Sequence, residues 1–376
     1  MNIIKHMNII VFSTYGYSLD TWNNSGTLKR ELELYKKINK DHGVSFTFIT
    51  YGTKKDLEFD TEIEGSKVVP IYSLIKFNKN PILRYVNSFI IPYKIKNIVK
   101  NGDILHQHQL LGSWIPIICK VIYRKKLLTR TGYDMFEFSK HQKKSILVKL
   151  LYRVLTKITL IFSDLYTVTS LSDKNLYKEN QKIKLRPNWV YKTDLIDLDK
   201  RYKNRILSVG RLEDQKNYRF LIEEFKNTKG ELTIDIYGSG QNLIVLNNLA
   251  NELNVDLNIY ENLNHDELKN IYSLYKYFIT TSLYEGNPKT VLEAMSSGCV
   301  VLASNIPNHQ DIIQNKHNGY LFNLEDKNLI NLYLELVKNQ NNLKKVSKNA
   351  FKDVSNKNSL ELLSSKTFND YISLVK

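Results

Sequence analysis

The residues best suited to chemistry are two glutamates, Glu285 and Glu293, which stand eight apart where a turn-forming stretch meets helically spaced apolar residues. Asn287 followed by Pro288 is typical of a helix start, with asparagine as the N-cap and proline at the first helical position. The free N–H groups of that first turn and the positive end of the helix dipole suit a diphosphate. One carboxylate could then accept a hydrogen bond from a ribose diol and the other from a sugar hydroxyl. The alternative is that both glutamates are only solvated.

A second motif offers two cations at the end of a predicted strand over 205–209, which is followed by Gly210. Open α/β sheets bind ligands where their strands end. Arg211 carries a planar guanidinium and Lys216 a mobile point charge, and together they could bind a diphosphate. Their alternative role is to balance the two acidic residues that lie between them on the surface.

These two motifs resemble those of the family-4 glycosyltransferases of the GT-B fold, and the resemblance extends from a strand at 7–13 to 319–322. The family's Glu-x7-Glu signature matches Glu285 to Glu293, and its Gly-Arg-Leu-x3-Lys-Asn segment matches 210–217. The resemblance implies an α/β protein with two Rossmann-like domains facing a cleft. It also implies sugar transfer from a nucleoside diphosphate with retention of the anomeric configuration, and neither a metal nor another cofactor.

The resemblance also implies roles for single residues. Glu285 would hold the donor hexose and Glu293 the ribose. Arg211 and Lys216 would stabilise the departing diphosphate, so these two cations and Glu285 form the expected catalytic set. The expected donor-binding residues are Gly26, Gly210, Arg211, Lys216, Glu285, Gly286, Asn287, Pro288, Lys289, Thr290 and Glu293.

The first half of the chain offers weaker landmarks of the same family. His106 and His108 match a strand-end Asp-x-x-His-x-His and are expected at the mouth of the cleft. Two histidines at this spacing could bind a metal, but no carboxylate or cysteine follows at ligand spacing, so a metal site is not expected. Many relatives carry a further histidine where this chain has Thr131. Contacts to the acceptor or donor are therefore expected from Arg130, Tyr133 and Asp134.

The elements that must position these residues alternate between strand and helix in both halves, which predicts two parallel, doubly wound sheets. A chain of 376 residues fits two such domains. The expected boundaries are 1–188 for an acceptor-binding domain, 189–358 for a nucleotide-sugar-binding domain, and 359–376 for a helix that packs back toward the first domain. The expected strands are 7–13, 44–50, 103–106, 126–130, 165–169, 205–209, 232–237, 256–260, 277–281 and 299–303.

Charge is distributed unevenly along the chain. Residues 1–190 hold 31 Lys and Arg against 15 Asp and Glu, whereas residues 191–376 hold 23 of each. The whole excess of +16 therefore lies in the first half. A basic acceptor domain predicts an anionic partner, which could be a lipid diphosphate, an acidic polysaccharide or the surface of a membrane.

The densest basic stretch, 140–158, reads as an amphipathic helix in which Lys149, Arg153 and Lys157 recur every four residues. Such a helix can lie on an anionic bilayer or can cover its own domain's sheet. No apolar run is long enough to span a bilayer. Residues 1–12 are read as the first strand and not as an export signal. The two cysteines fit a reducing compartment, so the expected location is cytoplasmic, peripheral to the inner face of the membrane.

The predicted function is transfer of a hexose from a UDP- or GDP-sugar to a glycan or lipid-linked acceptor, in assembly of bacterial surface polysaccharide or lipopolysaccharide. The alternatives are an epimerase or hydrolase of nucleotide sugars on the same fold, and a non-catalytic basic module that binds nucleic acid or membrane. Nucleic acid is not an expected partner, because no nucleic-acid motif is present. Two weak motifs are set aside: the glycine pair at 238–240, which lacks the third glycine of a dinucleotide fingerprint, and Asp-x-Asp at 197–199.

Overall fold

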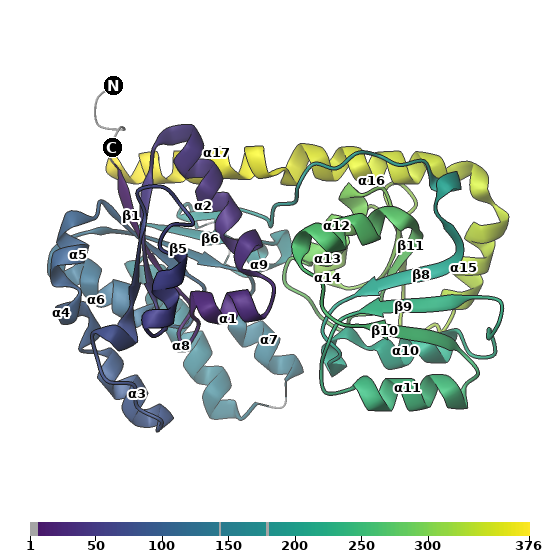
Figure 1. Cartoon of the computed structure of the whole chain (residues 1–376), viewed down its shortest axis with the longest axis horizontal. Coiled ribbons are helices and arrows are strands. Elements are labelled where there is room, and N and C mark those ends of the chain that lie inside the picture. The colour runs from purple at the N-terminus through teal and green to yellow at the C-terminus, as the bar shows by residue number, and fades with distance from the viewer. Residues whose placement is uncertain (1–6, 143, 178–179) are drawn as a thin grey trace. The chain divides into compact units, whose positions relative to one another are not determined.

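The computed structural model describes residues 7–142, 144–177 and 180–376 (Figure 1). Residues 1–6, which were expected to lead into the first strand, and Lys143 of the basic stretch lie outside the described residues. The chain forms two compact units. Unit 1 consists of Met1–Arg186 and Leu363–Lys376, and unit 2 of Pro187–Leu362.

Unit 1 is built on a seven-stranded parallel sheet with strand order β3-β2-β1-β4-β5-β6-β7. Helices cover both faces of the sheet. On one face, Ile10, Leu105 and Leu127 pack against α4, α5 and α6, and on the other Tyr35 of α2 packs against Phe46. The strands are β1 (Asn8–Phe12), β2 (Ser45–Thr50), β3 (Lys67–Pro70), β4 (Ile104–His108), β5 (Lys126–Thr131), β6 (Leu165–Val168) and β7 (Ile183–Leu185). The helices are α1 (Leu19–Asn24), α2 (Leu28–His42), α3 (Pro81–Ser88), α4 (Ile91–Lys94), α5 (Lys96–Asn101), α6 (Trp114–Tyr123), α7 (Met135–His141), α8 (Ile146–Phe162) and α9 (Leu171–Asn175), with short 3₁₀ helices η1 (Lys54–Phe59) and η2 (Ile71–Ser73).

The last helix, α17 (Leu360–Val375), contributes residues 363–375 to unit 1. The Tyr371 hydroxyl lies 2.8 Å from Nδ1 of His106 on β4. The Asp370 carboxylate is 2% exposed and accepts two hydrogen bonds from the Arg186 guanidinium, at 2.6 and 2.7 Å. It also accepts a hydrogen bond from the Lys184 ammonium at 3.0 Å. Bidentate pairs of this kind are strong and geometrically specific. The C-terminal helix is therefore tied to the second half of the unit 1 sheet.

Unit 2 is built on a six-stranded parallel sheet with strand order β10-β9-β8-β11-β12-β13. Its first and last segments lie together, because the amide of Val190 donates to Asn358 O and the amide of Leu360 donates to Val190 O. The strands are β8 (Tyr202–Val209), β9 (Thr233–Tyr237), β10 (Asp256–Tyr260), β11 (Tyr275–Thr280), β12 (Val300–Ser304) and β13 (Tyr320–Phe322). The helices are α10 (Tyr218–Glu224), α11 (Leu243–Glu252), α12 (His265–Leu274), α13 (Lys289–Ser296), α14 (Pro307–Gln310), α15 (Leu329–Lys338) and α16 (Leu343–Asn358), with 3₁₀ helices η3 (Leu198–Lys200), η4 (Asp214–Lys216) and η5 (Gln340–Asn342).

Two apolar layers sandwich the unit 2 sheet. Ile206 and Ile234 pack toward α10, α11 and α15, while Leu207 and Phe278 pack toward α12, α13 and α16. Because both faces are covered, a central strand such as β12 is buried at every residue rather than at alternate ones.

The predicted α/β fold with two doubly wound parallel sheets is confirmed. Each of the ten predicted strands has a counterpart in the structure. The three strands that were not predicted, β3, β7 and β13, lie at sheet edges and contain only three or four residues. Such short segments carry little hydrophobic periodicity, so their pairing depends on the neighbouring strand and not on their own sequence.

Candidate active site

The position of the site follows from the order of the strands in unit 2. Along the sequence, β8 is followed by β9 and β10 on one side, and the chain then returns to build β11, β12 and β13 on the other side. The neighbouring strands β8 and β11 therefore form the topological switch point of this sheet. Ligands of open α/β sheets bind at such a point, beyond the carboxyl ends of the strands. The loops that follow β8 and β11 carry the two predicted motifs.

Backbone and side-chain hydrogen bonds join these two loops. The amide of Leu283 donates to Gln215 O at 2.9 Å, and Nε2 of Gln215 donates to Tyr284 O at 2.9 Å. The hydroxyl of Thr281 donates to Lys216 O at 2.9 Å. Because three independent bonds connect the loops, the side chains that they carry are held in register with one another.

The central contact of the site is an ion pair between Lys216 and Glu285. Nζ of Lys216 lies 2.5 Å from Oε1 of Glu285, and the side chains are only 14% and 9% exposed. Oε1 also accepts the Ser282 hydroxyl at 2.7 Å. Burial raises the pKa of Glu285, but the Lys216 charge and the hydrogen bonds from Lys216 and Ser282 together hold this pKa below its usual value. The carboxylate is therefore ionised at neutral pH.

Glycines allow the loops to pack this closely. A Cβ on Gly210 would lie 2.9 Å from Cε of Lys216, so the lysine stem crosses the space where a side chain would be. A Cβ on Gly238 would lie 1.9 Å from Gly210 O. The glycine pair at 238–240, set aside in the sequence as a weak dinucleotide motif, thus lets the loop after β9 support the loop after β8. The amide of Leu212 donates to Ser239 O at 2.8 Å across this contact.

Arg211 is not brought to the ion pair. Its side chain is 64% exposed and lies 3.0 Å from Glu213. A weaker contact of 3.4 Å links it to the side-chain oxygen of Gln215. The arrangement is the surface pair that the sequence offered as the alternative for this arginine, although the guanidinium remains on the same loop as Lys216.

The helix that follows the second loop begins one residue later than predicted, at Lys289, and its N-cap is Pro288. Asn287 does not cap the helix, which corrects the sequence prediction. Its Oδ1 accepts the amide of Asn188 at 2.7 Å, and its carbonyl accepts Nδ2 of Asn188 at 2.7 Å. The Asn287 side chain, which was predicted to cap the helix, is therefore engaged in a contact with Asn188. Gly286 is buried beside it, and Lys289 and Thr290, in the first turn, are half-buried.

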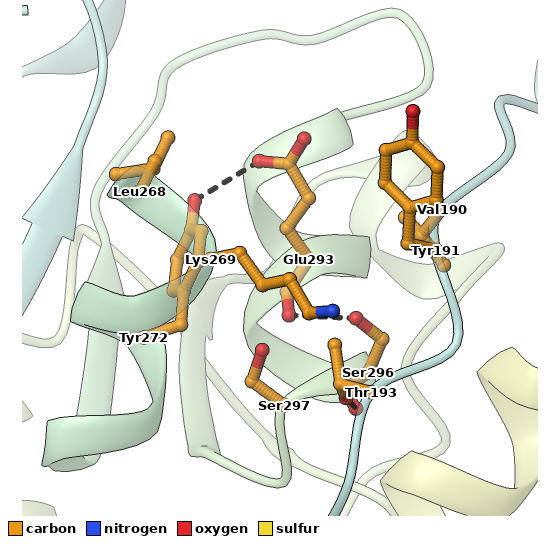
Figure 2. Close-up of a pocket in the computed structure, with 9 residues that line it drawn as sticks. All are labelled: Val190, Tyr191, Thr193, Leu268, Lys269, Tyr272, Glu293, Ser296 and Ser297. Atoms are coloured by element: carbon orange, nitrogen blue, oxygen red, sulfur yellow. Dashed lines mark hydrogen bonds between the residues drawn. The ribbon is translucent and has the colours of Figure 1, made fainter. Parts of the chain in front are cut away.

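Glu293, in the middle of α13, lines a pocket whose lining includes neither Lys216 nor Glu285. It is 6% exposed, and its Oε2 accepts the Tyr272 hydroxyl of α12 at 3.2 Å. In Figure 2 the carboxylate lies between Tyr272 and Tyr191. The pocket around it is lined by Val190, Tyr191, Thr193, Leu268, Lys269, Tyr272, Glu293, Ser296 and Ser297. The two glutamates thus have different partners: Glu285 is paired with a lysine, and Glu293 accepts a tyrosine hydroxyl.

The sequence analysis missed a buried polar group behind Glu285. Nδ1 of His309 lies 2.8 Å from Ser304 O, and the Ser304 hydroxyl donates to Ser282 O at 2.6 Å. Burial lowers the pKa of His309, although the Glu285 charge acts in the opposite direction. A neutral imidazole therefore supports the loop that carries Glu285. No spacing rule links positions 282, 304 and 309, so no sequence signal could have joined them.

Unit 1 has a switch point of its own, between β1 and β4. A pocket at this point is lined by Thr14, Tyr17, Trp22, Thr27, Glu31, His108, Gln109, Leu111, Tyr133 and Met135. Trp22 contacts His108 edge to face with ring centroids 5.6 Å apart, and Glu31 lies 3.8 Å from Nε2 of His108. Gly26 lies in the turn that joins α1 to α2, with a φ of +68° that favours glycine. Aromatic rings beside a carboxylate suit the apolar faces and hydroxyl groups of a sugar.

Other residues predicted at the unit 1 cleft are placed differently. His106 is 1% exposed and bonded to Tyr371, so it does not line the pocket, and burial holds its pKa well below the usual value. Asp134 caps α7 by accepting the amide of Glu137 at 2.8 Å and also accepts the Tyr177 hydroxyl, so both of its oxygens have structural partners. Histidines two apart share a face of the strand, but only His108, nearer its end, lines the pocket.

The remaining first-domain positions differ in exposure. Tyr133 lines the pocket and stacks on Phe138 at 4.0 Å. Arg130 is half-buried at the end of β5, paired in the sheet with His108. Thr131, at the place of the family histidine, is 2% exposed. Among the described residues there is no group of three or more His, Cys, Asp or Glu positioned to hold a metal ion.

Comparison with known proteins gives three kinds of match. Residues 197–353 match the sequence model of the glycosyl transferases group 1. An uncharacterized glycosyltransferase of Methanocaldococcus jannaschii is 28% identical over 266 residues, which are 61% of this chain and 64% of that protein, less than two thirds of its length. The UDP-Gal:alpha-D-GlcNAc-diphosphoundecaprenol alpha-1,3-galactosyltransferase of Escherichia coli is 27% identical over 277 residues, which are 65% of this chain and 68% of that protein.

Among solved structures, that of the Anabaena protein HepE in complex with UDP and glucose matches with a TM-score of 0.76 and 15% identity, covering 98% of this chain and 100% of that one. At this identity the likeness shows the fold alone. The fold is GT-B, with two Rossmann-like domains.

Proposed function

We propose, on the premise that residues 197–353 match the sequence model of the glycosyl transferases group 1, that this chain transfers a hexose from a nucleoside-diphosphate sugar to a glycan acceptor. The donor is a UDP- or GDP-sugar, the configuration at the anomeric carbon is retained, and no metal takes part. The observation that carries the proposal is the buried pair of Lys216 and Glu285 at the switch point of unit 2.

The proposed mechanism assigns each residue a task in bond exchange. The bond from the anomeric carbon to the diphosphate breaks as the acceptor oxygen bonds to that carbon, and the acceptor proton passes to an oxygen of the leaving phosphate. Lys216 stabilises the negative charge that grows on the diphosphate, which is the term expected to lower the barrier most. The first-turn N–H groups of Lys289 and Thr290 point toward the same charge. Arg211 exchanges its exposed contact with Glu213 for a phosphate oxygen.

The two glutamates divide the donor between them. Glu285, ionised beside Lys216, accepts a hydrogen bond from a hydroxyl of the hexose. Glu293, in its pocket of tyrosines, accepts from the ribose diol. Since a carboxylate can accept two hydrogen bonds from neighbouring hydroxyls, Glu293 can hold both ribose oxygens while keeping its bond from Tyr272.

The proposed acceptor is a lipid-linked glycan, and the pathway is assembly of a bacterial surface polysaccharide or lipopolysaccharide. Support comes from the E. coli relative, whose name gives a diphosphoundecaprenol acceptor, and from the basic first half of this chain. The pocket of unit 1, with Tyr17, Trp22 and Glu31, is the proposed binding place of the acceptor sugar. The protein would then work in the cytoplasm at the inner face of the membrane.

The test has two steps. The first is a thermal-shift screen with UDP, GDP, ADP and CMP and their sugar conjugates, because a ligand that binds only the folded state raises the melting temperature. The second incubates the donor identified in this way with and without lipid-linked glycan acceptors, in the presence and absence of a chelator. Transfer that needs an acceptor and survives chelation supports the proposal. Donor consumption without acceptor would indicate an epimerase or hydrolase, and absence of any shift would indicate a binding module.

A further inference from the structure

Helix α8 leaves most of its large apolar side chains exposed to water. Its buried residues are Thr156 and Thr159, and the Thr159 hydroxyl lies 2.8 Å from that of Ser113, the N-cap of α6. Its exposed residues include Ile146, at 84%, and Ile161, at 70%. A helix that served only to cover its own sheet would bury its apolar stripe, as α2 does with Leu32, Tyr35 and Ile38. Leu160 packs against the Tyr166 cluster of unit 1, but most of the large apolar side chains of α8 stay exposed to water.

Helix α3 also exposes large apolar side chains, which the sequence analysis did not foresee. Its one buried residue is Ser88, whose hydroxyl accepts the indole N–H of Trp114 at 2.9 Å. Ile82 is 71% exposed and Val86 is 56% exposed, and Tyr93, just beyond in α4, is 63% exposed. Monomeric soluble proteins rarely expose apolar side chains in such density, and where they do the patch usually binds something.

The two helices flank the same element. Tyr85 of α3 contacts Trp114 of α6 with ring centroids 5.0 Å apart, and α8 meets α6 one residue earlier, at Ser113. Both helices extend to the lower end of unit 1 in Figure 1. We call the exposed apolar side chains of α3, α4 and α8 the α3–α8 face.

The two chain segments that carry this face are basic, although Glu137 of α7 lines a pocket with Arg153 and Lys157. Residues 65–102, which contain α3 and α4, include seven Lys and Arg and no Asp or Glu. Residues 138–163, which contain α8, include six Lys and Arg and again no acid. Arg153 and Lys157 are exposed among the apolar residues of α8. Within the described residues, no helix is both long enough and apolar enough to cross a membrane.

We propose that the α3–α8 face binds the surface of an anionic lipid bilayer. Apolar side chains of α3 and α8 enter the boundary between headgroups and acyl chains, and the cations beside them contact the anionic headgroups. Charge decides between this occupant and a second copy of the chain, because two copies meeting through this face would bring cations against cations. The inference extends the proposed peripheral location. The experiment below measures lipid binding in the absence of any sugar donor. A negative result for lipid binding is therefore distinguishable from failure of the proposed transfer reaction.

The experiment is co-sedimentation of the full chain with vesicles of phosphatidylglycerol and phosphatidylcholine, compared with pure phosphatidylcholine. Binding is expected on the anionic vesicles, weakened by salt. The double variant Ile82→Ser/Val86→Ser is expected to lower the partition coefficient at least about tenfold. The matched control is Ile244→Ser/Val245→Ser on α11 of unit 2, where the same residue types are 72% and 58% exposed, and it is expected to bind like the wild type.

Melting temperature and nucleotide binding, measured on both double variants, separate a loss of lipid binding from a loss of folding. A second double variant, Arg153→Gln/Lys157→Gln, is expected to lose the preference for anionic vesicles. The proposal is overturned if the wild type binds neither kind of vesicle. It is also overturned if the α11 variant loses as much vesicle binding as the α3 variant. A third contrary outcome is that the wild type is a dimer, and that the α3 substitutions make it monomeric while leaving vesicle binding unchanged.

Discussion

Replacing Lys216 by methionine removes the charge of the central ion pair but keeps the stem that crosses Gly210. Breaking a fully buried pair costs about 3–5 kcal/mol, because the remaining ion is left in a poorly solvated site. Here Glu285 keeps its 2.7 Å bond from Ser282 and can take up a proton, so we expect a loss of about 2 kcal/mol in the free energy of unfolding at neutral pH. The leaving diphosphate loses its cation, so the activation free energy should rise by about 2–4 kcal/mol. Turnover should therefore fall roughly 30- to 1000-fold.

Urea unfolding and initial-rate measurements would read the two effects separately. The control is Lys226→Met, which removes an exposed lysine just after α10. A double-mutant cycle with Glu285→Gln completes the design, and we expect a coupling of about 1–2 kcal/mol in stability, because the second substitution removes the stranded charge. Additive stability effects would show that the pair does not couple in solution. Turnover equal to that of the wild type would refute the role of Lys216 at the diphosphate.

Three further predictions concern the donor, pH and packing. Glu293→Gln should weaken binding of the free nucleoside diphosphate, whereas Glu285→Gln should weaken the intact sugar donor more than the free nucleotide; calorimetric titrations that found equal effects on both ligands would contradict the division of roles. Because His106 and His309 have lowered pKa values in the folded chain, the unfolded chain binds more protons below their usual value of 6.5, so the free energy of unfolding should fall as pH drops below 6.5 and recover above it. Urea unfolding from pH 7.5 to 5.5 measures this, and His309→Asn should give a flatter profile. Gly238→Ala should cost about 2 kcal/mol of stability and weaken donor binding, because its Cβ would lie 1.9 Å from Gly210 O; an unchanged melting temperature would show that the loop after β8 moves freely.

The sequence predicted the fold well because alternation and strand-end chemistry are local signals. Apolar strands such as β1 and β12 are visible in any window of their own length. The order of strands in a doubly wound sheet then follows from general rules, and with it the switch point where the motifs at 210–217 and 285–293 had to lie.

The detail of the site could not be predicted, because it depends on contacts between residues far apart in the chain. Asn287 satisfies a local capping rule, yet Asn188, ninety-nine positions away, takes its side chain. His106 and His108 look equivalent in the sequence, but Tyr371 covers only the first. The stretch 140–158 was predicted as one amphipathic helix, but it is divided between the end of α7 and α8, and the residues that α8 buries are Thr156 and Thr159.

The two pieces of unit 1 have a consequence for how the protein is made. Unit 2 is an insertion whose ends are clasped by Val190 and Leu360, so all of its residues leave the ribosome before residues 363–376 do. Domains generally fold as units during synthesis. Unit 2 can therefore finish folding first, although it begins halfway along the chain. Unit 1 must wait with His106 uncovered and Arg186 without its carboxylate until Tyr371 and Asp370 emerge. A premature stop codon near position 362 would thus remove residues that unit 1 needs, whereas unit 2 would keep all of its own residues.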